Sequence, residues 1–522
     1  MEKGRHKHKK GSRFRENSLQ RIVLAALAVL LQIGWLLFAV IKLNSHFVEI
    51  ETVIRVIALI TALLILGNRT NTTFKESWLF LILAAPVFGM TIYFLFGNSF
   101  PLNRERKIYN KLNYAVSKHM PNNDGVLERL KEQDDNWSSQ ADYLANYMGF
   151  PIYDDSEITF FGDTNEALEA QLAAIKSAKE YIFMEYFAVE DAEAFSRMKE
   201  LLIEKAAEGV NVRIMYDDVG SVGFVNPKFG RELEGKGIEC RIFNRIIPFV
   251  KLFLNNRDHR KLMIVDGEIA FTGGYNIADE YFNITHPYGV WKDSGVRIRG
   301  NAVISVTGMF LEMWNSISPT DEDYGVYMKP AKTIVAGAPG NVFVQPFCDT
   351  PLDDEYVGEN VYLNMIALAR ESLYISTPYV AVTEEMVRQL GLAARRGVDV
   401  RMVIPGIPDK KIVYELTKSY VPKLLENGVR IYCYTPGFNH AKQFCADGKA
   451  AVVGTINMDF RSFCHHFEDG VFWYGGDAVE QVSRDFEEMF AVSDELTPDS
   501  KVGRMRRLGI WQSLLRLLAP LL

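Results

Sequence analysis

One set of five residue types occurs twice in this 522-residue chain, with the same spacing both times. The first set is His259, Lys261, Asp266, Gly273 and Asn276, and the second is His440, Lys442, Asp447, Gly454 and Asn457. A pattern that recurs at identical offsets indicates a duplicated structural unit. We therefore expect two homologous domains, each of which supplies half of one active centre.

The duplication extends beyond these motifs. The segment 209–215 (GVNVRIM) is similar to 397–403 (GVDVRMV), and 310–314 (FLEMW) is similar to 486–490 (FEEMF). From Pro151 onward, apolar strand-like runs alternate with amphipathic helical stretches, which is typical of an α/β fold with a largely parallel sheet. The chain therefore predicts two pseudo-twofold related α/β domains, 148–335 and 336–500, with mostly parallel sheets flanked by helices.

Three apolar stretches near the N-terminus are candidate transmembrane helices. The stretches 22–41 and 78–96 carry no charged residue, and 50–66 carries Arg55 near its start. About 20 apolar residues are needed to cross a bilayer as a helix. A cleaved signal peptide is the alternative for 22–41, but this stretch is too long and lacks a clear small-residue cleavage site.

Basic segments flank this region on both sides. The tail 1–21 and the stretch that follows residue 96 are rich in lysine and arginine. The positive-inside rule places both in the cytoplasm, which requires an even number of spans and leaves the behaviour of one segment open. We expect a multi-pass membrane protein with cytoplasmic catalytic domains, joined to the membrane region by a linker at 98–147.

Composition excludes some classes of function. The net charge of −7 argues against a general nucleic-acid binder. The five cysteines have no zinc spacing and form no even-numbered disulfide framework, so reduced buried thiols are expected. The chain has no EF-hand loop, P-loop, HExxH motif or cysteine–histidine zinc pattern, and no cofactor or metal is expected.

The repeated residue types suit phosphodiester chemistry without a metal. One imidazole can attack phosphorus while the other protonates the leaving alkoxide. Because side chains alternate along a strand, His259 and Lys261 lie on the same face. The lysines and asparagines can then hold the nonbridging oxygens as charge rearranges.

These motifs resemble the HKD signature of the phospholipase D superfamily, and the chain is similar to the bacterial cardiolipin synthases within it. The resemblance covers residues 50 to 522. It includes the segments 256–261 (NRDHRK), 273–279 (GGYNIAD), 377–379 (TPY), 454–462 (GTINMDFRS) and the terminal 519–522 (APLL).

The resemblance implies transfer of a phosphatidyl group from one phosphatidylglycerol to another through a phosphatidyl-histidine intermediate in a bacterial cell membrane. His259 would be the nucleophile and His440 the general acid and then base, although the pseudo-symmetry leaves this order open. By the same resemblance Lys261, Lys442, Asn276 and Asn457 would bind phosphate.

The resemblance also assigns supporting residues. Glu468 matches a family position whose carboxylate supports a catalytic imidazole, and pseudo-symmetry makes Asp293 its counterpart. For Asp266 and Asp447, orientation of the histidines and a structural role are both open.

The chain departs from the family two residues before this glutamate. The family often has asparagine there, and this chain has His466 beside His465. A structural substitution is expected rather than a role in acceptor binding.

Other readings remain open at this point. The C-terminal segment 501–522 is amphipathic and either lies in the headgroup region or packs on the protein.

The expected partners are phosphatidylglycerol and other anionic lipids, and the oligomeric state is not predicted. The alternatives in function are a phospholipase D that uses water, a transferase with another alcohol acceptor, a membrane-tethered HKD nuclease, and a scaffold with an inactive duplicated site.

Overall fold

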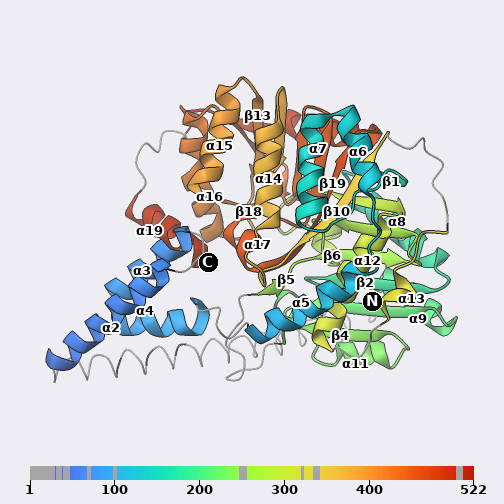
Figure 1. The fold of residues 1–522 in the computed structure, drawn as a ribbon, viewed down its shortest axis with the longest axis horizontal. Coiled ribbons are helices and arrows are strands. Elements are labelled where there is room, and N and C mark those ends of the chain that lie inside the picture. The colour runs from blue at the N-terminus through green and yellow to red at the C-terminus, as the bar shows by residue number, and fades with distance from the viewer. Residues whose placement is uncertain are drawn as a thin grey trace, which may run out of the picture.

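Two α/β domains form the body of the protein, and helices near the N-terminus extend away from it (Figure 1). The computed structural model describes residues 48–67, 72–97, 103–245, 256–318, 323–332, 341–500 and 509–521, and the single residues 30, 34, 38 and 502.

The first domain is built on a seven-stranded sheet with the order β1-β9-β7-β6-β2-β3-β4. Its strands are β1 (Ser156–Phe161), β2 (Tyr181–Tyr186), β3 (Asn211–Asp217), β4 (Glu239–Phe243), β6 (Lys261–Val265), β7 (Ile269–Gly273) and β9 (Gly295–Gly300). One face packs against α8 (Thr164–Ser177), α9 (Glu193–Ala207) and α11 (Phe229–Glu234), and the other packs against α12 (Val303–Ile317).

The second domain repeats this order with equivalent strands, β10-β19-β17-β16-β11-β13-β14, and adds β20 at the edge. Its strands are β10 (Phe343–Asp349), β11 (Ser372–Ser376), β13 (Asp399–Pro405), β14 (Arg430–Tyr434), β16 (Gln443–Ala446), β17 (Ala450–Gly454), β19 (His466–Tyr474) and β20 (Ser493–Leu496). Its helices are α14 (Val357–Leu368), α15 (Glu384–Arg395), α16 (Lys411–Glu426) and α18 (Asp477–Ala491). The identical strand order confirms the prediction of two homologous α/β domains.

The prediction of mostly parallel sheets is wrong. In the first sheet only the β2–β3 and β3–β4 pairs are parallel, and the four other pairs are antiparallel. Each parallel pair has a helical crossover, whereas β6 and β7 are joined by a tight turn at Asp266 and Gly267, which forces antiparallel pairing. Both turn residues have positive φ, 55° and 69°.

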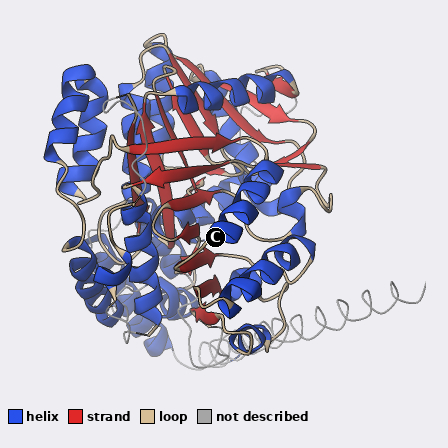
Figure 2. Cartoon of the chain, turned by 90° about the vertical axis from the view of Figure 1, so that its right-hand side faces the viewer, coloured by secondary structure: helices blue, strands red, loops and turns tan. Residues whose placement is uncertain are grey.

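The two sheets face each other across a shared hydrophobic core. This core joins side chains of both sheets, such as Phe183 and Leu262 of the first and Val403 and Trp473 of the second, with apolar residues of α12 and α18. Figure 2 shows the strands gathered in the middle of the molecule with helices on the flanks. Burial of this common core fixes the two domains against each other.

Short parallel pairings also cross between the domains. β5 (Arg257–Asp258), just before the first motif, pairs with the start of β19 of the second domain. β15 (Gly437–Asn439), just before the second motif, pairs with β8 (Val290–Lys292) of the first domain. Each histidine motif therefore directly follows a short strand that pairs with the other half.

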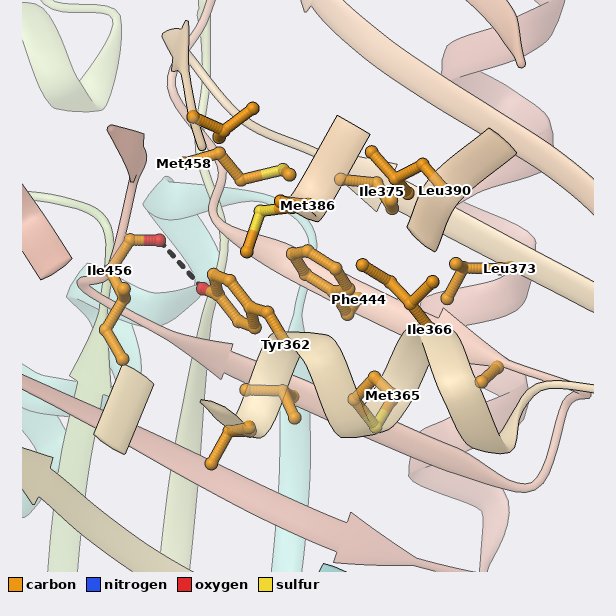
Figure 3. Close-up of a cluster of buried hydrophobic side chains, with 14 of the residues drawn as sticks. Tyr362, Met365, Ile366, Leu373, Ile375, Met386, Leu390, Phe444, Ile456 and Met458 are labelled. Carbon is orange, nitrogen blue, oxygen red and sulfur yellow. Dashed lines mark hydrogen bonds between the residues drawn. The ribbon is translucent and has the colours of Figure 1, made fainter. Parts of the chain in front are cut away.

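A second cluster holds the loop that follows β17. Tyr362 on α14 stacks on Phe444 of β16 with ring centroids 4.0 Å apart, and its hydroxyl donates to the carbonyl of Ile456 at 2.7 Å (Figure 3). Ile456 immediately precedes Asn457, so this contact fixes the backbone of the repeated asparagine.

The sequence suggested a linker at 98–147, and the described part of it, 103–147, forms packed helices. These are α5 (Asn103–Ser117), α6 (Asp124–Gln133), α7 (Asp135–Asp142) and the π-helix η3 (Tyr143–Tyr147). α5 packs on α12, while Leu130 and Trp137 are buried in the core of the second domain. The polar composition reflects exposed faces, and the apolar positions are spaced to cover both domains.

The structure describes two of the three N-terminal apolar stretches. The predicted span 22–41 lies outside the described residues except for three single positions, and 50–66 lies within α2 (Val48–Gly67). The stretch 78–96 is divided among α3 (Thr72–Ala84), α4 (Pro86–Ile92) and the π-helix η1 (Tyr93–Gly97), because Pro86 lacks an amide hydrogen and clashes with the preceding turn. In the described part of the chain, none of the helices is both long and apolar enough to cross a membrane.

The C-terminal helix α19 (Ile510–Leu518) contacts both α3 and α16. Ser77 on α3 donates to the carbonyl of Leu517 at 2.6 Å, and Arg516 donates to the carbonyl of Ser419 on α16 at 2.9 Å. Leu515 is buried, whereas Ile510 and Trp511 are exposed. One face of the helix thus joins the N-terminal helices to the second domain.

Candidate active site

The two repeated histidines are buried between the domains, and the backbone of each is held by the opposite half. The amide of His259 donates to the carbonyl of Phe467 at 2.9 Å, and that of His440 donates to the carbonyl of Lys292 at 2.7 Å. Both bonds continue the crossed strand pairs described above. The expected composite site is therefore assembled by reciprocal contacts between the two halves.

The side chain of each histidine also contacts the opposite half. His259 Nδ1 lies 2.9 Å from Oε2 of Glu468, and His440 Nδ1 lies 2.7 Å from Oδ2 of Asp293. Glu468 belongs to the second domain and Asp293 to the first, so each imidazole meets a carboxylate from the other copy. A carboxylate at Nδ1 fixes ring orientation and stabilises the protonated imidazole.

Both repeated lysines are almost fully buried beside their histidines. The ammonium of Lys261 donates to the backbone carbonyl of His259, and that of Lys442 donates to the carbonyl of His440. Lys442 Nζ also lies 2.9 Å from His440 Nδ1. Burial lowers the pKa of Lys261 to about 8 and that of Lys442 to about 7.

The two imidazoles lie in an environment that opposes protonation. Burial, followed by the charge of Lys442, lowers the pKa of His440 to about 4, although Asp293 acts in the opposite direction. Burial and the charge of Lys261 lower the pKa of His259, and His440 itself adds to this effect. The two histidines are thus close enough to influence each other's protonation.

Asp266 and Asp447 lie at the opposite ends of their strands from the histidines. The carboxylate of Asp266 accepts hydrogen bonds from the amides of residues 179, 180 and 181, and that of Asp447 accepts from the amides of residues 370, 371 and 372. At about 3.3 Å per residue, the separation from His259 along the chain is roughly 20 Å. These contacts favour the structural role, since each carboxylate holds the start of the neighbouring strand.

The two repeated asparagines are bonded differently from each other. Asn276 accepts from the amide of Ala188 at 3.0 Å and donates to the hydroxyl of Tyr281 at 2.8 Å. Among the described residues, Oδ1 of Asn457 is buried without a hydrogen-bond partner. Asn276 therefore has one amide hydrogen left for a ligand, and the amide of Asn457 is less constrained.

His466 and His465 point to different parts of the molecule. His466 Nδ1 lies 3.4 Å from Oε1 of Glu468, and its ring centroid is 5.3 Å from that of His259. His465 instead packs edge-on against Phe74 of α3, with centroids 5.2 Å apart. Of the described residues, His259, His466 and Glu468 form a group that could hold a metal ion, with ligand atoms within 4.8 Å of one another.

Some residues around the site carry no signal in the sequence. Thr455 lies between the repeated glycine and asparagine, and its hydroxyl donates to Oε2 of Glu468. Trp291 and Phe438, on the paired strands β8 and β15, pack around His440 with centroids 5.2 and 5.6 Å from its ring. Their positions depend on the pairing between domains, which local sequence patterns do not reveal.

Comparison with known proteins agrees with this geometry. A family model described as "Cardiolipin synthase, PLD-like domain" matches residues 172–314 and 362–490, and a second, for the phospholipase D-nuclease N-terminal region, matches 53–98. An uncharacterized protein of Streptococcus mutans is 37% identical, covering 88% of this chain and 99% of its own. A cardiolipin synthase of Listeria welshimeri is 33% identical, covering 87% of this chain and 95% of its own.

A solved structure has the same fold. The phosphatidylserine synthase of Haemophilus influenzae superimposes with a TM-score of 0.54 at 14% identity, covering 73% of this chain and 97% of the other. The duplicated domains, the reciprocal site and the matches over most of the chain lead to one assignment. The chain belongs to the cardiolipin synthase family of the phospholipase D superfamily.

Proposed function

We propose that the protein transfers a phosphatidyl group between two phosphatidylglycerol molecules, which yields cardiolipin and glycerol. The observation that carries this proposal is the pair of buried imidazoles, each with a carboxylate of the other half at Nδ1 and a buried lysine beside it. Relatives that share most of this chain are named cardiolipin synthases, which supports the choice of substrate.

In the first step, Nε2 of His259 attacks the phosphorus of one phosphatidylglycerol. A P–N bond forms, the P–O bond to the glycerol headgroup breaks, and His440 gives a proton from Nε2 to the leaving oxygen. The phosphodiester brings a negative charge between the imidazoles, which raises the pKa of His440 from its low value in the free site.

In the second step, His440 takes a proton from a hydroxyl of a second phosphatidylglycerol. That oxygen attacks phosphorus, the P–N bond to His259 breaks, and cardiolipin leaves. Attack by water would instead give phosphatidic acid, so the outcome depends on which hydroxyl reaches the intermediate.

An asymmetry between the halves supports His259 as the nucleophile. The contacts of His259 Nδ1 are with Glu468, so the ring proton lies on Nδ1 and a lone pair remains on Nε2. His440 Nδ1 also faces the ammonium of Lys442 at 2.9 Å. The carboxylate of Asp293 opposes this ammonium and raises the pKa of His440, so that the ring can hold the second proton that a general acid gives from Nε2.

The lysines and asparagines complete the phosphate site in this proposal. Lys261 and Lys442 are held by the backbone carbonyls of their own motif histidines, which keeps each ammonium group beside its histidine. With the free amide hydrogen of Asn276 and the amide of Asn457, they would hold the nonbridging oxygens.

We also propose that the N-terminal helices insert into the bilayer and that the catalytic domains face the cytoplasm. α2 exposes a run of large apolar side chains, at positions 53, 56, 57, 59, 60, 63, 64 and 66, and the basic start of α5 follows the apolar region. A single cysteine that replaces Arg104 in a cysteine-free background should react with an impermeant reagent only in inside-out vesicles. Reaction only from the outer side would reverse the orientation.

The test of function is incubation of the purified full chain with phosphatidylglycerol vesicles, followed by lipid analysis. Cardiolipin with an equal amount of glycerol is the expected result, and phosphatidic acid alone would show a phospholipase instead. His259→Ala and His440→Ala should each abolish transfer, and turnover in either variant would contradict the two-histidine mechanism.

A further inference from the structure

We propose that His466 is a positioning residue for His259, acting through Glu468. Its Nδ1–H would be a further donor to the glutamate beside Thr455, which keeps the carboxylate an acceptor and so holds the proton of His259 on Nδ1. This inference rests on the proposed role of His259 as the nucleophile.

The contacts of His466 define its tautomer. Nε2 lies 3.4 Å from Nε–H of Arg461, which can only donate, so Nε2 carries the lone pair. The ring proton is then on Nδ1, 3.4 Å from Oε1 of Glu468. Nδ1 is buried and, among the described residues, has no hydrogen bond of its own, so Glu468 is the acceptor within its reach.

The separation of 3.4 Å is longer than a well-formed hydrogen bond. Contacts of this kind often shorten when the substrate binds. A small rotation of either side chain brings the donor into range, because Oε1 of Glu468 otherwise faces His259 Nδ1 at 3.0 Å.

Glu468 needs such donors. The side chain is fully buried on β19, and burial raises its pKa well above the usual value, while the charge of Lys261 and the hydrogen bond from Thr455 oppose this. A proton added to Glu468 would make it a donor toward His259 Nδ1. The proton of the imidazole would then lie on Nε2, and the nucleophilic lone pair would be lost.

Two substitutions test the contacts of the two nitrogens of His466 independently. The amide of asparagine occupies the place of Nδ1, so His466→Asn keeps a donor to Glu468 and loses the contact with Arg461. The amide of glutamine reaches the place of Nε2, so His466→Gln keeps the contact with Arg461 and loses the donor to Glu468. A structural role would not distinguish these variants in this way.

The pH profile of transfer is the sensitive measurement. Loss of a donor destabilises the ionised form of Glu468 and raises its pKa, and the active form requires it ionised, so the acid limb moves to higher pH. The groups that face this pair are His259 and Lys261 of the first motif, Arg257 on β5, Arg461 on α17 (Phe460–Cys464), His465 after it, Asp459 on β18 (Met458–Asp459), and Lys442 of the other half.

Transfer of phosphatidyl groups is measured from pH 5 to 9 with the full chain in phosphatidylglycerol vesicles. In His466→Gln the midpoint of the acid limb should move to higher pH by about one unit. In His466→Asn it should stay within about 0.3 pH units of the wild-type value. His465→Gln is the matched control, since His465 contacts Phe74; it should lower the melting temperature without moving the limb.

The proposal would be overturned if the acid limbs of the asparagine and glutamine variants lay at the same pH, or if the asparagine variant showed the larger shift. Circular dichroism and the melting temperature reveal a variant that fails to fold. In that case the question is decided by the amount of covalent adduct that the remaining variant forms with a short-chain phosphatidylglycerol. Absence of transfer in the wild-type chain would instead contradict the proposed function.

Discussion

Replacing Glu468 with glutamine tests the reciprocal arrangement of the active site most directly. Oε2 of Glu468 accepts from the hydroxyl of Thr455, and both carboxylate oxygens lie within 3.0 Å of His259 Nδ1. If the amide oxygen keeps the bond from Thr455, the amide NH2 faces His259 Nδ1 and donates to it. The opposite rotamer leaves two donors, the amide and Thr455, facing each other.

The two opposed donors disfavour the opposite rotamer, so the first arrangement prevails and removes the nucleophilic form of His259. A donor at Nδ1 puts the ring proton on Nε2, and the charge that stabilises the imidazolium is lost. Replacement of a triad carboxylate by its amide lowers turnover about 10,000-fold for the same reason. This corresponds to about 5.5 kcal/mol in activation free energy, at about 1.4 kcal/mol for each factor of ten.

The assay is the initial rate of cardiolipin formation, together with the amount of covalent phosphatidyl adduct trapped by rapid acid quenching. Glu359→Gln is a matched control, because Glu359 is also a buried glutamate that contacts a threonine hydroxyl, that of Thr383 at 3.0 Å, away from the histidines. The control should keep its rate within about threefold. Retention of more than about a tenth of the wild-type rate in Glu468→Gln would refute the tautomer argument.

Three further outcomes are expected. Asp266→Ala should lower the free energy of unfolding by about 3 kcal/mol, because three backbone amides lose a charged acceptor, and denaturant unfolding should show this while the rate of the folded fraction stays near normal. The value of kcat/KM should fall above pH about 7 as Lys442 loses its proton. Its lowered pKa means that the charged form is present below that pH and is lost above it. A flat profile up to pH 9 would contradict the assignment of Lys442 to phosphate binding. Ser77→Val should lower the stability by about 1 kcal/mol, because the part-buried carbonyl of Leu517 loses its donor, and an unchanged melting temperature would show that α19 is not held through α3.

The sequence predicted the α/β class, the duplication and the repeated residues of the candidate site, because duplication leaves a record in residue spacing. The repeated His259 and His440, with their lysines and asparagines, could be identified since each motif is local to a strand and its turn. The sheets were predicted as mostly parallel because strand and helix patterns reveal crossovers, whereas the antiparallel hairpin at Asp266 is visible only as a turn.

The exchange between halves could not be predicted in the same way. Family resemblance pointed to Glu468 and Asp293, but nothing in their spacing shows which histidine each one contacts. That pairing depends on β5 and β15, strands of two and three residues that form only when the domains dock. The division of the apolar stretch at Pro86 was signalled by a single residue, and the burial of α5 to α7 depended on partners distant in the sequence.

The contacts between the two halves also determine when the site can form during synthesis of the chain. As the chain leaves the ribosome, the first domain emerges with His259 but without Glu468, and with Asp293 but without His440. In the proposed mechanism, a nascent chain that has folded only its first half would hold an imidazole with no oriented tautomer and no acid to expel an alkoxide. Phospholipid cleavage would then be impossible until β19 is made, and a half-finished enzyme would not attack phospholipids.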